Sequence, residues 1–112
     1  MKGLEVIRVQ VASHQEDQQV RMEKRLFDLR REVGRVPECT GLIAFEVFRQ
    51  TALPGSFAIH LLWDSAVPDP LGSVLGWNLR EALKEFGLVN HSVWLAMSPK
   101  ARSSWNPGGE DV

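Results

Sequence analysis

Residues 42–64, LIAFEVFRQTALPGSFAIHLLWD, contain two strand-like runs joined by a short segment with turn chemistry. The runs Leu42–Arg49 and Phe57–Trp63 are rich in β-branched and aromatic residues, and the connection between them contains proline, glycine and serine. Such runs, separated by turn residues, are typical of paired strands. The stretch therefore predicts a β-hairpin.

Alternation along the two runs gives the hairpin two different faces. If the turn is centred on Leu53, Glu46 lies directly opposite His60 on one face. That face also carries Ala44, Phe48, Ala58 and Leu62, and the other face is wholly apolar, with Ile43, Phe45, Val47, Ile59 and Leu61. An apolar face of this kind suits packing under helices. The Glu46–His60 pair is the first candidate for a functional site.

Length and composition limit what else the chain can hold. Its 112 residues fit one domain with a single core. A hydrophobic fraction of 44% and a charged fraction of 24% are those of a soluble globular protein. The net charge of -1 favours neither nucleic acid nor an anionic membrane as a partner.

The sequence has neither a membrane-spanning run nor a signal-peptide pattern, and it has one cysteine. No apolar run approaches the roughly 18 residues of a membrane span, and Met1-Lys2-Gly3 leads into a strand pattern rather than a signal peptide. We therefore expect a cytoplasmic protein. The single cysteine, Cys39, excludes an intrachain disulfide and a multi-cysteine metal site.

The flanking sequence supplies two helices and two further strands. Residues 4–11 alternate as a strand, and a capping box at Ser13 and Glu16 opens an amphipathic helix over about 15–33. Apolar spacing predicts a second helix over 71–86, followed by a strand over 89–97. Residues 99–112 have the composition of a mobile tail, which leaves a folded domain of residues 1–98.

The resulting order, β-α-β-β-α-β, is that of the ferredoxin-like α+β fold. Right-handed crossovers place the strands in the antiparallel order 4-1-3-2 with both helices on one face. The uncovered face would carry Arg8, Gln10, Ala44, Glu46, Phe48, Ala58, His60, Leu62 and Trp94. Because an apolar surface of this size is rarely left to water, we expect two copies to pack face to face as a homodimer.

The chain resembles the dimeric α/β-barrel proteins related to antibiotic biosynthesis monooxygenases. The resemblance rests on the element order, on Pro37-Glu38-Cys39-Thr40-Gly41 before the second strand, and on Trp63-Asp64-Ser65 after the third. It implies a barrel of two sheets that holds a small hydrophobic or aromatic ligand, and in some members oxidation of phenols or quinols without metal or flavin. The chain departs from the family pattern because residues 64–86 contain no histidine, only Ser73 and Asn78 as nearby polar candidates. A haem-degrading role is therefore disfavoured.

The candidate site follows from the hairpin pair. A carboxylate beside an imidazole raises its basicity, so His60 would act as a base and Glu46 would orient it. Arg8 or Asn78 would stabilise a developing anion, and Phe48, Leu62, Trp63 and Trp94 would shape the pocket. We expect no cofactor and no metal; nothing in the sequence brings His60 and His91 together, and His91 is interpreted as a strand-end residue.

Two questions stay open from the sequence. Alternation from His60 puts Trp63 on the helix side, whereas the resemblance would have it border the cavity, and one β-bulge would decide between them. The leading function hypothesis is cofactor-independent oxygenation of an activated aromatic. The alternative is a non-catalytic ligand-binding or interaction module in which the Glu46–His60 pair only sets the geometry of a homodimer.

Overall fold

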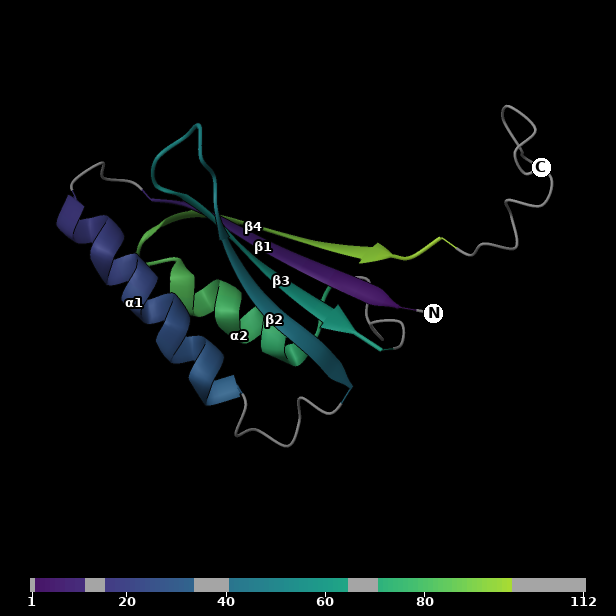
Figure 1. Cartoon of the computed structure of the whole chain (residues 1–112). Coiled ribbons are helices and arrows are strands. Elements are labelled where there is room, and N and C mark those ends of the chain that lie inside the picture. The colour runs from purple at the N-terminus through teal and green to yellow at the C-terminus, as the bar shows by residue number, and fades with distance from the viewer. Residues whose placement is uncertain (1, 12–15, 34–40, 65–70, 98–112) are drawn as a thin grey trace, which may run out of the picture.

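The computed structural model describes residues 2–11, 16–33, 41–64 and 71–97, which form four strands and two helices. In chain order these are β1 (Gly3–Val11), α1 (Glu16–Val33), β2 (Leu42–Arg49), β3 (Ser56–Trp63), α2 (Val74–Leu83) and β4 (Gly87–Leu95). The predicted ferredoxin-like order is confirmed (Figure 1). The predicted tail and the segment 37–40 lie outside the described residues.

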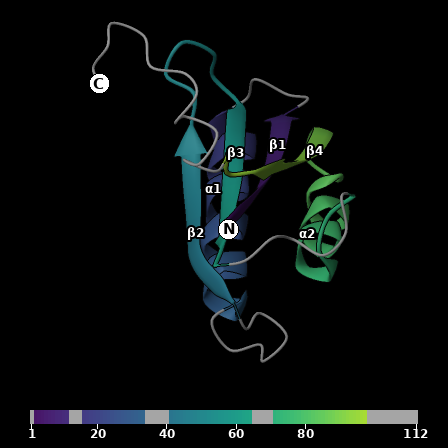
Figure 2. The same ribbon diagram turned by 90° about the vertical axis from the view of Figure 1, so that its right-hand side faces the viewer.

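The strands form one antiparallel sheet in the order β2-β3-β1-β4, as the crossover rule predicts. Both helices cover the same face, with α1 behind β2 and β3 and α2 towards β4 (Figures 1 and 2). We call the other side the open face. Register places on it Leu4, Val6, Arg8 and Gln10 of β1, Ala44, Glu46 and Phe48 of β2, Ala58, His60 and Leu62 of β3, and Leu88, Asn90, Ser92 and Trp94 of β4.

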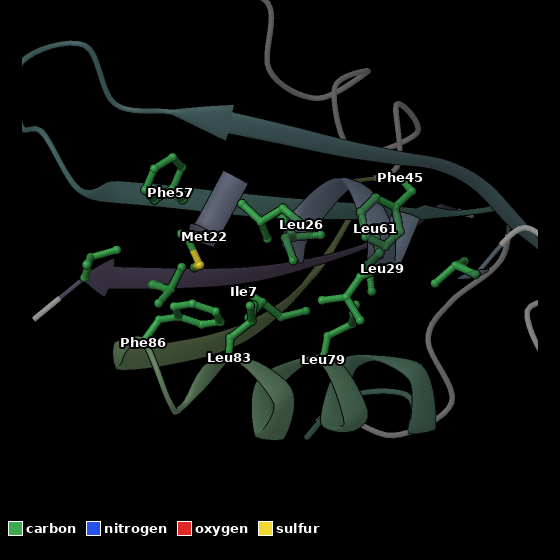
Figure 3. Packing of buried hydrophobic residues seen from close by; sticks show 14 residues of the cluster. Ile7, Met22, Leu26, Leu29, Phe45, Phe57, Leu61, Leu79, Leu83 and Phe86 are labelled. Carbon is green, nitrogen blue, oxygen red and sulfur yellow. The ribbon is translucent and has the colours of Figure 1, made fainter. Parts of the chain in front are cut away.

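The core fills the space between the sheet and the helices (Figure 3). Met22, Leu26, Leu29 and Val33 recur at helical spacing along α1 and are all buried, so this face of the helix was predicted correctly. They meet the inward residues of three strands and two buried leucines of α2: Ile7, Val9, Val11, Phe45, Phe57, Ile59, Leu61, Leu79 and Leu83, with Phe86 just after the helix. No helix in the described ranges is long and apolar enough to cross a membrane.

Helix α2 begins later than its apolar spacing predicts. Gly72 has a φ of 119°, a left-handed conformation that no helix continues through, and Ser73 then caps the helix by accepting the Gly76 N–H at 2.9 Å. Leu71, expected in the apolar stripe of this helix, precedes it and is exposed, so that prediction was wrong. The cap, rather than the hydrophobic pattern, fixes the start of the helix.

Trp63 follows the regular alternation of β3, whose pairing with β1 is unbroken, and the β-bulge lies instead at the start of β2. Leu42 pairs with Trp63 and Ala44 with Leu62, so Ile43 is the extra residue. Leu42 and Trp63 both pack against the core, whereas Ile43 is 49% exposed. The expectation that Ile43 belongs to the helix side was therefore wrong, and the strand-alternation placement of Trp63 was right.

Candidate functional site

The open face brings Glu46 and His60 together as predicted. The two are cross-strand partners of β2 and β3, and Val6 of β1 lies on the other side of His60. The β2–β3 register therefore follows the turn centre at Leu53 over residues 44–49. The predicted opposition of the two residues is confirmed.

Proximity on this face does not produce a hydrogen bond. Within the described ranges neither Glu46 nor Arg8 makes an ion pair or a side-chain hydrogen bond, and His60 lies against the Phe48 ring, with centroids 4.6 Å apart. Arg8 pairs with Ala58 and Asn90, two residues further along β1 than Val6, the partner of His60. The proposed catalytic roles of these three residues stay predictions.

The four residues predicted to shape the pocket, and Asn78 with them, are divided between the two sides of the sheet. Phe48 and Trp94 lie on the open face, 48% and 58% exposed, and Leu62 lies there half-buried. Trp63 points to the helix side, and Asn78 is exposed on α2 in the helix layer. The structure therefore brings Phe48 and Leu62 close to His60 but does not bring Trp63 or Asn78 there.

A second polar cluster, missed by the sequence reasoning, lies buried between the sheet and the start of α2. Its centre is Glu5, a fully buried carboxylate on the inward side of β1. Glu5 accepts the Trp63 indole N–H at 3.0 Å, the Ser73 backbone N–H at 3.0 Å and the Ser73 hydroxyl at 2.5 Å. Its Oε2 also lies 2.8 Å from Nε2 of His91 in β4. Four contacts from three other elements thus hold one carboxylate.

Two glycines make room for this cluster. A Cβ built on Gly76 would lie 2.1 Å from Oε2 of Glu5, and one on Gly72 would lie 2.3 Å from Cε1 of His91. The first turn of α2 therefore approaches the sheet more closely than any side chain would allow. The carboxylate also accepts the backbone N–H of Ser73 at the start of α2, where the peptide dipoles favour negative charge.

The imidazole of His91 has one satisfied and one unsatisfied nitrogen. Its side chain is only 3% exposed, and in the described part of the chain its Nδ1 is a buried polar atom with no hydrogen-bond partner. Trp63 and Ser73 donate three hydrogen bonds to Glu5, an arrangement that favours an ionised, accepting carboxylate, so we assign the proton of this contact to Nε2 of His91. In the neutral ring Nδ1 is then a bare acceptor.

The sequence does contain a signal for this cluster. Glu5 shares the parity of Ile7, Val9 and Val11, so the alternation of β1 places a carboxylate in the core-facing row. A buried charge requires a partner, and His91 has the parity of Val89 in the antiparallel neighbour. The interpretation of His91 as a strand-end residue was wrong, since it lies in the middle of β4.

A further pocket opens between α1 and the hairpin. It has a volume of about 250 Å³ and is lined by Glu23, Leu26, Phe27, Val47, Phe48, Arg49 and Phe57. Arg49 and Glu23 form an ion pair at 3.6 Å across it. The lining contains neither His60 nor His91, and its two charged side chains, Glu23 and Arg49, are paired with each other.

Comparison with known proteins identifies the fold. No family model and no curated protein matches the chain. Among solved structures, Rv0793 from Mycobacterium tuberculosis matches with 15% identity over 88% of this chain and 97% of its own, at a TM-score of 0.61. A candidate antibiotic biosynthesis monooxygenase from Caulobacter crescentus matches with 19% identity over 87% and 91%, also at 0.61.

A third structure is SnoaB, a cofactor-independent oxygenase from Streptomyces nogalater. It matches with 16% identity over 87% of this chain and 94% of its own, at a TM-score of 0.54. Since these identities are low, the likeness concerns the fold, and a fold of this kind hosts several functions. The ferredoxin-like α+β fold of the single chain, which the sequence resemblance implied, is confirmed, and the two-sheet barrel stays a prediction.

Proposed function

We propose, on the premise that this chain shares the fold of antibiotic biosynthesis monooxygenase structures, that it binds a small aromatic molecule and oxidises it with molecular oxygen without a cofactor. The observation that carries the proposal is the match, over most of both chains, to a fold that includes a cofactor-independent oxygenase. The substrate class is an activated phenol or quinol. A buried carboxylate–imidazole pair, Glu5 and His91, adds the acid–base chemistry that such a reaction needs.

The reaction balances without another redox partner. A phenol with a free para carbon and one O2 give a quinone and one water: one oxygen atom enters the ring, and the other leaves as water with two hydrogens from the substrate. The phenol itself supplies the electrons. The protein's part is to bind the ring, to remove the phenolic proton and to exclude bulk water.

The test is a panel of polycyclic phenols and hydroquinones, with protein that has been treated with a chelator and freed of flavin. We expect oxygen uptake and quinone absorbance to exceed the protein-free rate, and labelled O2 to place one labelled atom in the product. If the protein binds no panel member and consumes none faster than buffer alone does, the oxygenase proposal fails. The non-catalytic interaction module is then the better description.

We also propose that two copies pair through their open faces. Phe48, Trp94 and Leu88 are 48%, 58% and 81% exposed there, and paired apolar surface of this kind is typical of an interface. Replacing Leu62, on a central strand of this face, with glutamate would bury a charge between the copies.

We therefore expect the parent chain to sediment at twice its mass of 12.6 kDa at micromolar concentration and Leu62→Glu to shift towards the monomer. Leu53→Glu is the matched control, because Leu53 is a 46% exposed leucine in the hairpin turn, away from the open face. Analytical ultracentrifugation measures all three. A monomeric parent, or equal dissociation in both variants, would contradict the proposed interface.

A further inference from the structure

We propose that Glu5 and His91 form the acid–base dyad of this chain and that Nδ1 of His91 accepts the proton of a hydroxyl-bearing aromatic ligand. The inference rests on the proposed function and deepens it, because it assigns the base and derives the ligand chemistry from the site. His91 is the proposed catalytic base, and Glu5 is a positioning residue that acts through it.

The hydrogen bonds around Glu5 determine which nitrogen is free. The carboxylate is fixed by Trp63 and Ser73, and the 2.8 Å contact to Nε2 fixes the ring of His91. When a carboxylate accepts a hydrogen bond from the N–H of one ring nitrogen, the other ring nitrogen is the basic one. This is the arrangement of a catalytic histidine held by an acidic partner. Nδ1 is that second nitrogen.

The unsatisfied Nδ1 of His91 indicates the chemical class of ligand that the site would bind. More than nine-tenths of buried polar groups in proteins have a partner, and leaving one without costs about 1–3 kcal/mol. A structural role for the pair requires only the Nε2 contact and gives no reason to bury a bare acceptor. Because Nδ1 accepts but does not donate, its complement is a hydroxyl or enol donor; a carboxylate or phosphate ligand would repel it.

The neighbouring side chains suit an aromatic hydroxyl compound. The Trp77 ring lies edge-on to His91, with centroids 6.3 Å apart and planes at 77°, and Trp77 itself is 38% exposed. The guanidinium carbon of Arg80 lies 4.4 Å over the centroid of the Trp77 ring. Trp77 therefore connects the buried imidazole with the surface, and Arg80 adds positive charge on that side of α2. We expect the ligand to approach His91 past Trp77 and its phenolate to be favoured by that charge.

The alternative dyad on the open face lacks these features. Glu46 is exposed and His60 half-buried, and the two share no hydrogen bond, so neither the tautomer nor the orientation of His60 is fixed. A base works best when a second group orients it and water is excluded. On both criteria the Glu5–His91 pair is the better candidate.

The chemical step is a single proton transfer. The ligand O–H bond breaks, the electron pair stays on the phenolate oxygen, and the proton moves to Nδ1 of His91. The imidazolium that forms is stabilised by the Glu5 carboxylate on its other side. The proton returns to water when product leaves.

The test uses 4-nitrophenol, whose phenolate absorbs visibly and whose binding is measured separately by equilibrium dialysis. At a pH where the free probe is mostly protonated, we expect the parent protein to bind it as phenolate. His91→Gln should still bind the probe but without the phenolate band, and Glu5→Gln should weaken the band. With an oxidisable phenol, His91→Gln should lower the turnover rate by about 100-fold or more.

The outcomes separate the two proposals. If the parent binds 4-nitrophenol without ionising it, the dyad proposal is overturned and the oxygenase proposal stands. The same holds if His60→Gln abolishes the phenolate band and His91→Gln retains it. No binding of this probe, together with no turnover across the phenol panel, overturns both. Glu85→Gln, an exposed carboxylate after α2, controls for a general loss of negative charge.

A measurement on the unmutated protein keeps the inference falsifiable if a variant fails to fold. Nitrogen-15 NMR of the imidazole should show His91 with its proton on Nε2 and a bare Nδ1 that shifts when 4-nitrophenol is added. A proton on Nδ1, or a crystal structure with an ordered water on Nδ1 that the probe does not displace, would overturn the assignment.

Discussion

Replacing Glu5 with alanine should lower the free energy of unfolding by about 3–5 kcal/mol, the cost of removing one partner from a buried charged network. The substitution leaves the Trp63 indole, the Ser73 amide and hydroxyl and Nε2 of His91 without their acceptor. Each is a donor that would stay buried without a partner. Urea unfolding at a fixed protein concentration measures the change, since concentration affects the stability of a chain that associates.

Glu46→Ala provides the matched control. Glu46 is also a strand glutamate, but it is exposed and makes no side-chain hydrogen bond or ion pair in the described ranges. Its replacement should change stability by no more than about 0.5 kcal/mol. If Glu5→Ala is as stable as Glu46→Ala, the network does not hold α2 to the sheet, and the geometry proposed for His91 loses its basis.

Gly76→Ala should destabilise the protein by about 1–3 kcal/mol, although alanine is the better helix former by about 1 kcal/mol. The new Cβ would lie 2.1 Å from Oε2 of Glu5 and 2.9 Å from Nε2 of His91. Neither side chain is free to move aside, because the carboxylate is fully buried and held by four contacts. Either the network or the first turn of α2 must shift.

A double-mutant cycle identifies the cause. In the Glu5→Ala background the carboxylate is gone, so the further change Gly76→Ala should cost much less than it does in the parent. Thermal or urea unfolding of the four proteins gives the coupling energy. A Gly76→Ala penalty that is equal in both backgrounds would mean that the close approach to Glu5 is not its origin.

Local sequence signals determined most of the fold. The alternation of β1, β2 and β3 and the helical spacing of Met22, Leu26, Leu29 and Val33 follow from which side chains each element can bury, so they are visible without the structure. The turn chemistry of residues 50–55 fixed the register that places Glu46 opposite His60. The strand order followed from the handedness of the crossovers.

Only the tertiary structure decided which polar side chains form hydrogen bonds with Glu5. Glu5, Trp63, Ser73 and His91 come from four segments far apart in the chain, and only the pairing of β1 with β3 and β4, together with the close approach of Gly72 and Gly76, brings them within hydrogen-bond distance. The bulge at Ile43, which leaves Leu42 opposite Trp63 and Ala44 opposite Leu62, is likewise a product of strand pairing. A sequence pattern reports which side of an element a residue occupies, but hydrogen bonds depend on distances of a few tenths of an ångström between elements, which only packing sets.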